Sequence, residues 1–430
     1  MPRERVEVFG SSAASPEAVW AIARDFCGAW HPAIATVRAE RDDRGALIRA
    51  FTVQGEGTLY REQLTWFSDS DRTLGYTHLQ GIAGVETYDA WVSIEAGEAG
   101  GSVIRWSAAV AAPEPRLAAI CCGTKAIFEQ GIAALDRAAR DAMSPADTTK
   151  ALVAVATEDL ILEGTPRLAF TATRPKTGGL CLFLHGIGGA RWNWLPQLAV
   201  AGTVMRAAAL DLRGYGGSAL GPSPSTVDGY CDDILRLADA LDADRLVLVG
   251  LSYGSWLATS FAMRHPRRLM GLVLSGGCTG MSEARAEERE AFRVSRQVPL
   301  DAGQTPADFA GSVVKVLAGP NASDAVKEEL FVSMAAIPAT TYRDALHCFT
   351  DPPERFEFSR LTMPVLMMTG EFDRLASPTE IRGVARRIHD QAEQPDVRYE
   401  TIADAGHVCN IEQADRYNRI LLDFLRKLPQ

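Results

Sequence analysis

The chain has 430 residues, of which 47% are hydrophobic and 23% charged, and its formal net charge is -10. This length predicts two domains, with three as the upper bound, and the composition excludes disordered, collagen-like and coiled-coil proteins. The acidic excess is spread evenly, with 20 acidic against 15 basic side chains in residues 1–150 and 34 against 29 in the remainder. Neither part is a basic arm, so nucleic acid and anionic membranes are not expected partners.

The N-terminal segment and the cysteines indicate a cytoplasmic protein. The opening MPRERVEVFG carries charges where a signal peptide needs an apolar core, and no stretch approaches the ~20 uninterrupted apolar residues of a membrane span. The eight cysteines form no CxxC pair, and several lie inside apolar runs. They are predicted to be buried thiols rather than disulfides or zinc ligands, so no metal is expected.

Residues 1–142 predict one domain with an antiparallel sheet and a long final helix. Ser15 is expected to cap a helix over Ala18–Phe26, with Pro16 at its first position. Between residues 33 and 111, alternating segments are divided by short Gly- and Asp-containing turns, which is typical of antiparallel hairpins. A long amphipathic helix is predicted over Arg116–Met143. The named strands are Val6–Phe9, Ala46–Val53, Thr58–Phe67, Thr87–Glu95 and Val103–Val110.

This order of elements, with Val19-Trp20 on the first helix and Trp30-His31-Pro32 after it, resembles the START-related helix-grip superfamily (SRPBCC). That superfamily includes polyketide cyclase-like proteins. The resemblance implies a sheet that curves around the last helix and encloses a cavity for apolar or aromatic ligands. A small apolar molecule is therefore a candidate partner of this α+β domain. His31 and Glu62 can face such a cavity, although a histidine between Trp and Pro is more typical of a packed loop.

The pattern changes after residues 143–150, a small and polar stretch that predicts a linker. From 151 to 430, continuous apolar strands alternate with helices, which predicts a doubly wound α/β domain with a mostly parallel sheet. Ligand chemistry in such sheets lies at the carboxyl ends of the strands. The predicted strands are Leu180–Leu184, Val204–Leu210, Leu246–Val249, Leu269–Leu274, Pro364–Thr369 and Val397–Thr401.

One strand end carries a nucleophile motif. The strand Leu246–Val249 runs directly into Gly250-Leu251-Ser252-Tyr253-Gly254, a G-x-S-x-G pattern between a strand and a helix. In this nucleophile elbow a tight turn projects the serine oxygen at a helix N-terminus. A serine needs a base to take its proton and a carboxylate to orient that base. Asp373 and His407 each follow a later strand, in the order that such a triad requires.

With these residues in this order, the C-terminal region resembles the α/β-hydrolase fold superfamily. Ser252, Asp373 and His407 match the catalytic triad of that superfamily residue by residue. Glu371 is a competing acid, but the family pattern places the carboxylate at Asp373, and Asp404 is too near His407 along the chain. The resemblance implies chemistry that requires no cofactor.

The resemblance also implies an oxyanion hole made by the backbone N–H groups of Tyr253 and Ile187. His185, just before the second of these, is structural in the superfamily pattern. An insertion of about 85 residues, at about 278–362, is far longer than a usual crossover loop of ~2–6 residues. In the superfamily this position carries a helical cap over the active site. Candidate pocket residues, for each of which core packing or a solvated helix face is the alternative, are Trp192, Trp194, Phe331, His347 and Phe349.

The leading hypothesis is a capped serine hydrolase that cleaves an ester or lactone of a small apolar or aromatic metabolite. Gly250–Gly254 and Asp404–Glu412 resemble the corresponding fragments of enol-lactonases and small-ester hydrolases. Hydrolases of C–C bonds, of the meta-cleavage-product or β-diketone type, share the same residues and stay open as an alternative. Epoxide hydrolases and dehalogenases of this fold use Asp at the elbow, so Ser252 disfavours them.

Two hypotheses of another kind also stay open. A small-molecule receptor or carrier can retain the triad for slow turnover, and the attached cavity domain favours keeping that hypothesis. Alternatively, the N-terminal domain has an activity of its own, such as cyclisation or dehydration, coupled to hydrolysis of the product. The oligomeric state does not follow from the sequence.

Overall fold

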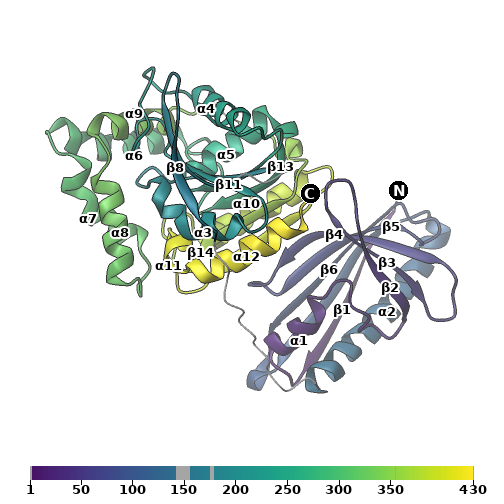
Figure 1. Cartoon of the computed structure of the whole chain (residues 1–430). Coiled ribbons are helices and arrows are strands. Elements are labelled where there is room, and N and C mark those ends of the chain that lie inside the picture. The colour runs from purple at the N-terminus through teal and green to yellow at the C-terminus, as the bar shows by residue number, and fades with distance from the viewer. Residues whose placement is uncertain (1, 142–154, 175–178, 354, 430) are drawn as a thin grey trace. The chain divides into compact units, whose positions relative to one another are not determined.

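The computed structural model describes residues 2–141, 155–174, 179–353 and 355–429. The chain divides into two compact units (Figure 1). The first comprises Met1–Lys150 and Gln394–Glu400, and the second comprises Ala151–Glu393 and Thr401–Gln430. The predicted linker, 143–150, lies outside the described residues.

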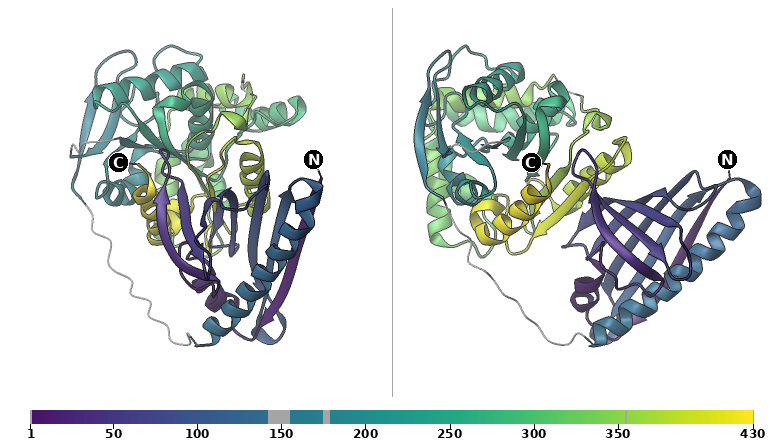
Figure 2. Two further views of the ribbon diagram at one scale, coloured as in Figure 1. Left: turned by 90° about the vertical axis from the view of Figure 1, so that its right-hand side faces the viewer. Right: turned by 45° about the vertical axis from the view of Figure 1, so that its right-hand side comes forward.

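The first unit is an antiparallel sheet with a long helix along it (Figure 2). Its elements are β1 (Arg3–Ser12), α1 (Pro16–Ala23), β2 (Ile34–Arg41), β3 (Leu47–Val53), β4 (Leu59–Ser68), β5 (Thr73–Gln80), β6 (Thr87–Ala96), β7 (Ser102–Ala111) and α2 (Glu114–Asp141). The antiparallel strands follow the order β1-β7-β6-β5-β4-β3-β2. As predicted, Ser15 caps α1, and its Oγ accepts a hydrogen bond from the backbone N–H of Ala18 at 3.3 Å.

Two strands of this sheet lack a clear sequence signal. In β2 most side chains are exposed, and in the described part of the chain it pairs only with β3, so it is an edge strand without an apolar face. The third residue of β5 is Gly75, which lies opposite Trp91 of β6. A Cβ at Gly75 would lie 3.1 Å from atoms of the Trp91 ring, so the indole occupies the space of the missing side chain.

Among the described helices, α2 meets the length and composition of a membrane span, with a mean hydropathy of 1.2 over an 18-residue window. Its Phe128, Ile132 and Leu135 are buried in the core of the first unit. Phe128 also stacks on Trp106 of β7, with 4.7 Å between the ring centroids. An apolar face packed on a sheet is the arrangement of a core helix in a folded domain.

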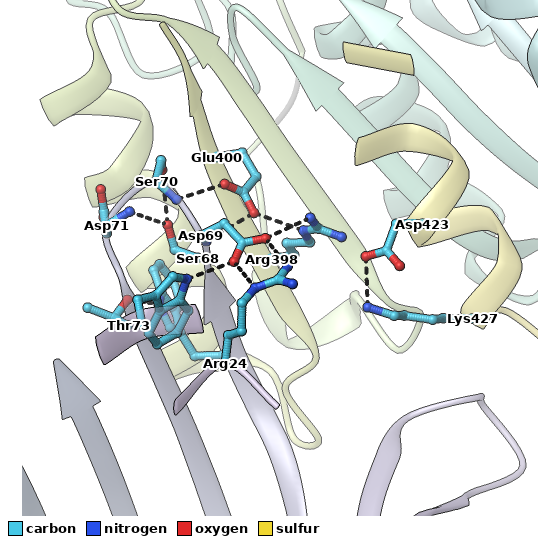
Figure 3. A network of polar contacts seen from close by, with 12 residues as sticks. Arg24, Ser68, Asp69, Ser70, Asp71, Thr73, Arg398, Glu400, Asp423 and Lys427 are labelled. Atoms are coloured by element: carbon cyan, nitrogen blue, oxygen red, sulfur yellow. Dashed lines mark hydrogen bonds and ion pairs between the residues drawn. The ribbon is translucent and has the colours of Figure 1, made fainter. Parts of the chain in front are cut away.

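The segment Gln394–Glu400 belongs to the first unit by its contacts. It contains most of a strand, β15 (Val397–Ile402), that pairs in parallel with β4. Figure 3 shows the polar network of this segment, in which Glu400 accepts hydrogen bonds from the backbone N–H groups of Asp69 at 3.1 Å and Ser70 at 3.0 Å. Arg398 donates to the same carboxylate at 3.0 Å. Burial raises the pKa of Glu400, and these donors stabilise the buried carboxylate.

The second unit is a mostly parallel sheet with helices on both faces. Its strands are β8 (Thr157–Leu162), β9 (Leu168–Thr173), β10 (Leu180–Leu184), β11 (Arg206–Leu210), β12 (Leu246–Leu251), β13 (Leu269–Ser275) and β14 (Val365–Gly370). They follow the order β14-β13-β12-β10-β11-β9-β8, in which the pairs β11–β9 and β9–β8 are antiparallel and the other pairs are parallel. Each of the six strands predicted for this region is present, within two residues of its expected bounds.

Helices cover this sheet on two sides. They are α3 (Leu195–Ala201), α4 (Val227–Ala240), α5 (Tyr253–Arg264), α10 (Pro378–Gln391), α11 (Cys409–Glu412) and α12 (Ala414–Lys427). In the view of Figure 1, α3 and α12 pack together below the sheet, and α4 and α5 pack together above it. The predicted doubly wound α/β class is confirmed.

The insertion between β13 and β14 is helical, as expected of a cap. It contains α6 (Ala286–Asp301), α7 (Pro306–Leu317), α8 (Asp324–Ala335) and α9 (Ala339–Thr350). Helices α7 and α8 pack side by side at the left of Figure 1, and α6 packs against α9. This cap lies at the carboxyl ends of the parallel strands, where the predicted functional residues are.

Candidate active site

Ser252 stands at the turn between β12 and α5 in a strained conformation. Its φ of 54° and ψ of -112° place a non-glycine residue in the left-handed region, which side chains rarely adopt. Its backbone N–H donates to the carbonyl of Ser275 on β13 at 2.8 Å, which holds the turn. The strain projects the serine side chain into a cavity that Ser252 lines together with His407.

The two glycines of the motif have separate steric reasons. A Cβ at Gly250 would collide with the backbone of Gly254, the second residue of α5. A Cβ at Gly254 would collide with the carbonyl of Leu184, at the end of the neighbouring strand β10. Only glycine lets β12, β10 and α5 approach this closely at the serine.

His407 and Asp373 form a buried pair beside Ser252. The Nδ1 atom of His407 lies 2.9 Å from Oδ2 and 3.1 Å from Oδ1 of Asp373. The Asp373 carboxylate also accepts the backbone N–H groups of Leu375 at 2.8 Å and Ala376 at 2.9 Å. Burial alone would raise the pKa of Asp373, but His407 and these N–H groups hold that pKa below its ordinary value.

The other ring nitrogen of His407 is open. Its Nε2 is buried and has no hydrogen-bond partner among the described residues. The His407 side chain is 4% exposed and lines the same cavity as Ser252. Since Nδ1 donates to an ionised carboxylate, Nε2 of the neutral ring is an acceptor, which is the state that a general base needs.

The competing acids are engaged elsewhere. Glu371 is exposed, and its Oε2 accepts the backbone N–H of Asp404 at 3.0 Å. Asp404 accepts the side-chain amide of Asn321 at 2.7 Å. Of the three acids weighed from the sequence, only Asp373 forms a hydrogen bond to the His407 ring in the described structure.

The predicted oxyanion donors, Tyr253 and Ile187, both line the cavity. Tyr253 is the first residue of α5, so its N–H lies in the turn whose donors have no acceptor within the helix. The loop that carries Ile187 is fixed from behind, because the hydroxyl of Tyr215 donates to the Ile187 carbonyl at 3.0 Å.

His185 ties this loop to the end of β11. Its Nε2 accepts the backbone N–H of Leu212 at 3.1 Å, so its Nδ1 is the donor to the Gly186 carbonyl at 2.8 Å. Burial lowers the pKa of His185, which favours this neutral form. Both nitrogens are occupied, as expected of a structural histidine.

The cavity has a volume of about 490 Å³, and residues of the cap helices form part of its lining. Trp194 and Phe349 line it, as expected, but Trp192, Phe331 and His347 are not among the described residues that do. The Trp192 indole instead donates to Ser333 on α8 at 3.1 Å, while His347 and Phe331 are exposed on their cap helices. These contacts agree with the alternative weighed for each of the three, core packing or a solvated helix face.

The sequence gives no direct indication of the cap residues that do line the cavity, among them Phe292 and Arg296 of α6 and Tyr342 of α9. Arg296 belongs to a strongly charged helix, and from the sequence an arginine in such a helix is expected to be exposed to solvent. Its place in the cavity lining depends on the packing of α6 against α9.

The first unit encloses a second cavity, of about 460 Å³. Arg49 and Glu62 line it, as was expected of Glu62, and Nε of Arg49 donates to Oε2 of Glu62 at 2.6 Å. Both residues are 7% exposed. The Arg49 guanidinium lies over the rings of Phe26 at 4.6 Å and Tyr76 at 4.8 Å. Further aromatic residues that line this cavity are Phe51, Tyr60, Tyr88 and Trp106.

His31 lines the second cavity with both ring nitrogens engaged. Its Nδ1 accepts the backbone N–H of Ala33 at 3.1 Å, and its Nε2 bonds the Ile127 carbonyl at 3.0 Å. Burial lowers the pKa of His31. It therefore has the contacts of a packed loop residue. Among the described residues, no group of three or more His, Cys, Asp or Glu side chains is arranged to hold a metal ion.

Comparison with known families identifies both units. A family model described as alpha/beta hydrolase fold matches residues 180–414. A second, described as polyketide cyclase / dehydrase and lipid transport, matches residues 3–140. Both resemblances expected from the sequence are thereby confirmed.

Individual relatives are distant. The chain is 23% identical over 259 residues to 3-oxoadipate enol-lactonase 1 of Acinetobacter baylyi, covering 59% of this chain and 91% of the relative. It is 23% identical to bifunctional epoxide hydrolase 2 of Mus musculus, covering 57% of this chain and 51% of the relative. A thermophilic esterase of Thermogutta terrifontis matches in structure with a TM-score of 0.54 and 26% identity, covering 63% of this chain and 98% of the esterase.

Proposed function

Because the chain belongs to the alpha/beta hydrolase fold family, we propose that it is a serine hydrolase for the ester or lactone bond of a small apolar or aromatic metabolite. Ser252, His407 and Asp373 are its proposed catalytic triad. One observation carries the proposal: the buried Nε2 of His407 is unpartnered in the cavity that Ser252 lines, while Nδ1 is bound to Asp373.

The proposed reaction begins when Ser252 Oγ attacks the substrate carbonyl and Nε2 of His407 takes the hydroxyl proton. Asp373 holds Nδ1–H and stabilises the imidazolium that forms. His407 then donates the proton to the leaving oxygen, which leaves an acyl-enzyme. Water, deprotonated by the same nitrogen, attacks the acyl carbonyl and restores the serine.

The N–H groups of Tyr253 and Ile187 are the proposed donors to the oxyanion in both steps. They are backbone groups at the start of α5 and in a braced loop, so they need no reorganisation when the charge develops. Loss of one such donor typically raises the barrier by about 2.7–4 kcal/mol.

Two of these relatives support an oxygen ester as the bond that is cleaved. The enol-lactonase and the esterase both act on such bonds by name, and this supports an ester or lactone substrate. The epoxide hydrolase relative supports the fold, but Ser252 occupies the position where enzymes of that kind use Asp. C–C bond hydrolysis is the alternative that the same triad can perform.

Steady-state assays on the full chain test the proposal, with esters, lactones and β-diketones of matched size as substrates. Turnover of an ester or lactone that is abolished in Ser252→Ala is the expected result. Turnover that persists unchanged in Ser252→Ala contradicts the serine mechanism. Faster cleavage of the β-diketone than of every ester and lactone contradicts the proposed bond class.

We further propose that the second cavity binds a small apolar or aromatic ligand. The observation that favours it is the aromatic lining around a mutually neutralised Arg49–Glu62 pair, which leaves apolar and π surfaces for the ligand. Gly123 of α2 also lines this cavity, and a Cβ there meets no atom within 4 Å.

Quenching of tryptophan fluorescence by 2-naphthol, a small aromatic probe, tests this second proposal. Gly123→Leu is expected to weaken the binding because its side chain enters open space at the cavity. Gly311→Leu, at an equally open position on α7, is the control. Equal binding to all three proteins contradicts the proposal.

A further inference from the structure

Arg296 of α6 brings a positive charge to the catalytic cavity. Of the described residues that line this cavity, it is the one Lys or Arg. Its guanidinium lies 3.4 Å from the centroid of the Phe292 ring, and Nη1 donates to the Phe292 carbonyl at 3.2 Å and to Ser295 Oγ at 3.1 Å. Phe292 and Ser295 also line the cavity, so the guanidinium is held by residues of the same wall.

This charge has no acidic counterpart in the described structure. Arg293 of α6, Arg343 of α9 and Arg285, which precedes α6, each form an ion pair with an Asp or Glu. Arg296 forms none among the described residues and interacts instead with the phenol of Tyr342, which is buried. An arginine stays protonated at all accessible pH values, so the cavity wall carries an uncompensated cation.

An unpaired cation in a partly dehydrated site is unfavourable unless a ligand supplies the counter-charge. The guanidinium presents a planar fork of N–H donors that matches both oxygens of a carboxylate. We propose that Arg296 binds a carboxylate of the substrate, so that the preferred substrates are esters or lactones that bear a free carboxylate besides the bond that is cleaved. This inference rests on the proposed function of the same cavity.

A negative charge elsewhere in the lining of the cavity sets the direction in which such a substrate binds. Among the described residues that line the cavity, Glu380 of α10 is the acidic one, and it does not belong to the proposed triad. Its carboxylate lies near that of Asp373, and the two negative charges make this side of the cavity unfavourable for an anion. A substrate carboxylate therefore points toward α6, with the scissile carbonyl at Ser252.

As a consequence, the enzyme is expected to select substrates by their chain length. One end of the substrate is held by Arg296 and the other must reach Ser252 Oγ, so rate is expected to peak at one chain length in a series of dicarboxylic acid monoesters. Neutral esters of the same lengths lack the first anchor and are expected to show no such peak.

The test compares monomethyl esters of C4 to C8 dicarboxylic acids with neutral methyl esters of matched length, using full-chain protein. In Arg296→Met, kcat/KM for the best carboxylate substrate is expected to fall about 10- to 100-fold, the usual effect of losing a charged hydrogen bond. The matched neutral ester is expected to be unaffected. Arg296→Lys retains part of the preference, and Arg293→Met, which removes an arginine outside the cavity, keeps the wild-type ratio.

Each outcome bears on the inference. An equal fall for both substrates in Arg296→Met shows a purely structural residue and overturns the proposal, as does a wild-type preference for neutral esters. Binding provides a second readout, because a free dicarboxylate should slow phosphonate labelling of Ser252 in the wild type and not in Arg296→Met. If Ser252 is not labelled in any of these proteins, the serine mechanism has failed rather than the role of Arg296.

Discussion

The two cavities have similar volumes, about 490 and 460 Å³, yet they differ in whether the polar groups that line them have hydrogen-bond partners. In the first unit, Arg49 and Glu62 neutralise each other, and both nitrogens of His31 are bonded. In the second unit, Nε2 of His407 has no partner in the described structure. A cavity that binds can satisfy all of its own polar groups, whereas a cavity that reacts must leave some of them open to the substrate.

The largest expected effect is on kcat, and it concerns residues of the second unit's cavity only. Ser252→Ala and His407→Ala are each expected to lower kcat for an ester substrate by ~10⁴-fold or more, because each removes a member of a unit that acts together. His265→Gln, which changes a histidine outside both cavities, serves as the control and should keep the wild-type kcat. If kcat falls less than tenfold in Ser252→Ala and His407→Ala, the proposal that this cavity is the catalytic one is contradicted.

The second effect concerns stability of the first unit. Arg49→Met leaves Glu62 buried and unpaired, which typically costs about 3–5 kcal/mol of unfolding free energy. The double variant Arg49→Met/Glu62→Leu is expected to recover most of this loss, since no charge is then left unpaired. Urea denaturation measures both.

The matched control is Arg285→Met, which breaks an ion pair that is exposed on the cap. It is expected to leave stability unchanged. A loss in Arg49→Met as small as in this control would show that the first cavity does not depend on its internal pair.

A third effect concerns the close approach at the nucleophile turn. Gly254→Ala forces a Cβ against the Leu184 carbonyl, and overpacking of this kind costs about 1–3 kcal/mol. Gly383→Ala, inside α10 with nothing within 4 Å of the new Cβ, is expected to stabilise by about 0.4–1 kcal/mol instead. Thermal unfolding of both variants checks this difference in sign.

The smallest effect is a pH dependence of stability. The pKa of Asp373 is lowered against the effect of burial, because His407 and two backbone N–H groups bind its carboxylate. A lowered pKa contributes stability that is present above the unfolded value, about 4, and that is lost as the pH falls through the folded value. The stability difference between wild type and Asp373→Asn should therefore shrink below pH ~4. A difference that grows on acidification would contradict the assigned direction.

A feature of this fold can be predicted from the sequence when the contacts that require it lie within one short segment of the chain. The turn at Ser252 is readable because its glycines are required by contacts within one strand–turn–helix unit. The β5 strand escapes notice because Gly75 depends on Trp91 of another strand. Arg296 escapes notice because only the packing of α6 with α9 takes it away from solvent. His347 lies on the exposed face of α9, the alternative weighed for it, and two residues farther along the helix Phe349 lines the cavity.

Other expectations stay predictions. The linker at 143–150 lies outside the described residues, and the cytoplasmic location and the roles of the triad and the oxyanion donors are for experiment to decide. The fold class and both family resemblances could be predicted, since they follow from strand and helix periodicity and from motifs at strand ends.

The central claim is that reaction occurs at Ser252. Its most direct test is labelling of the full chain with a serine-reactive phosphonate, followed by intact mass measurement and peptide mapping. We predict one adduct per chain, on Ser252, and no adduct on Ser252→Ala. An unlabelled wild type, or equal labelling of Ser252→Ala, would contradict the account.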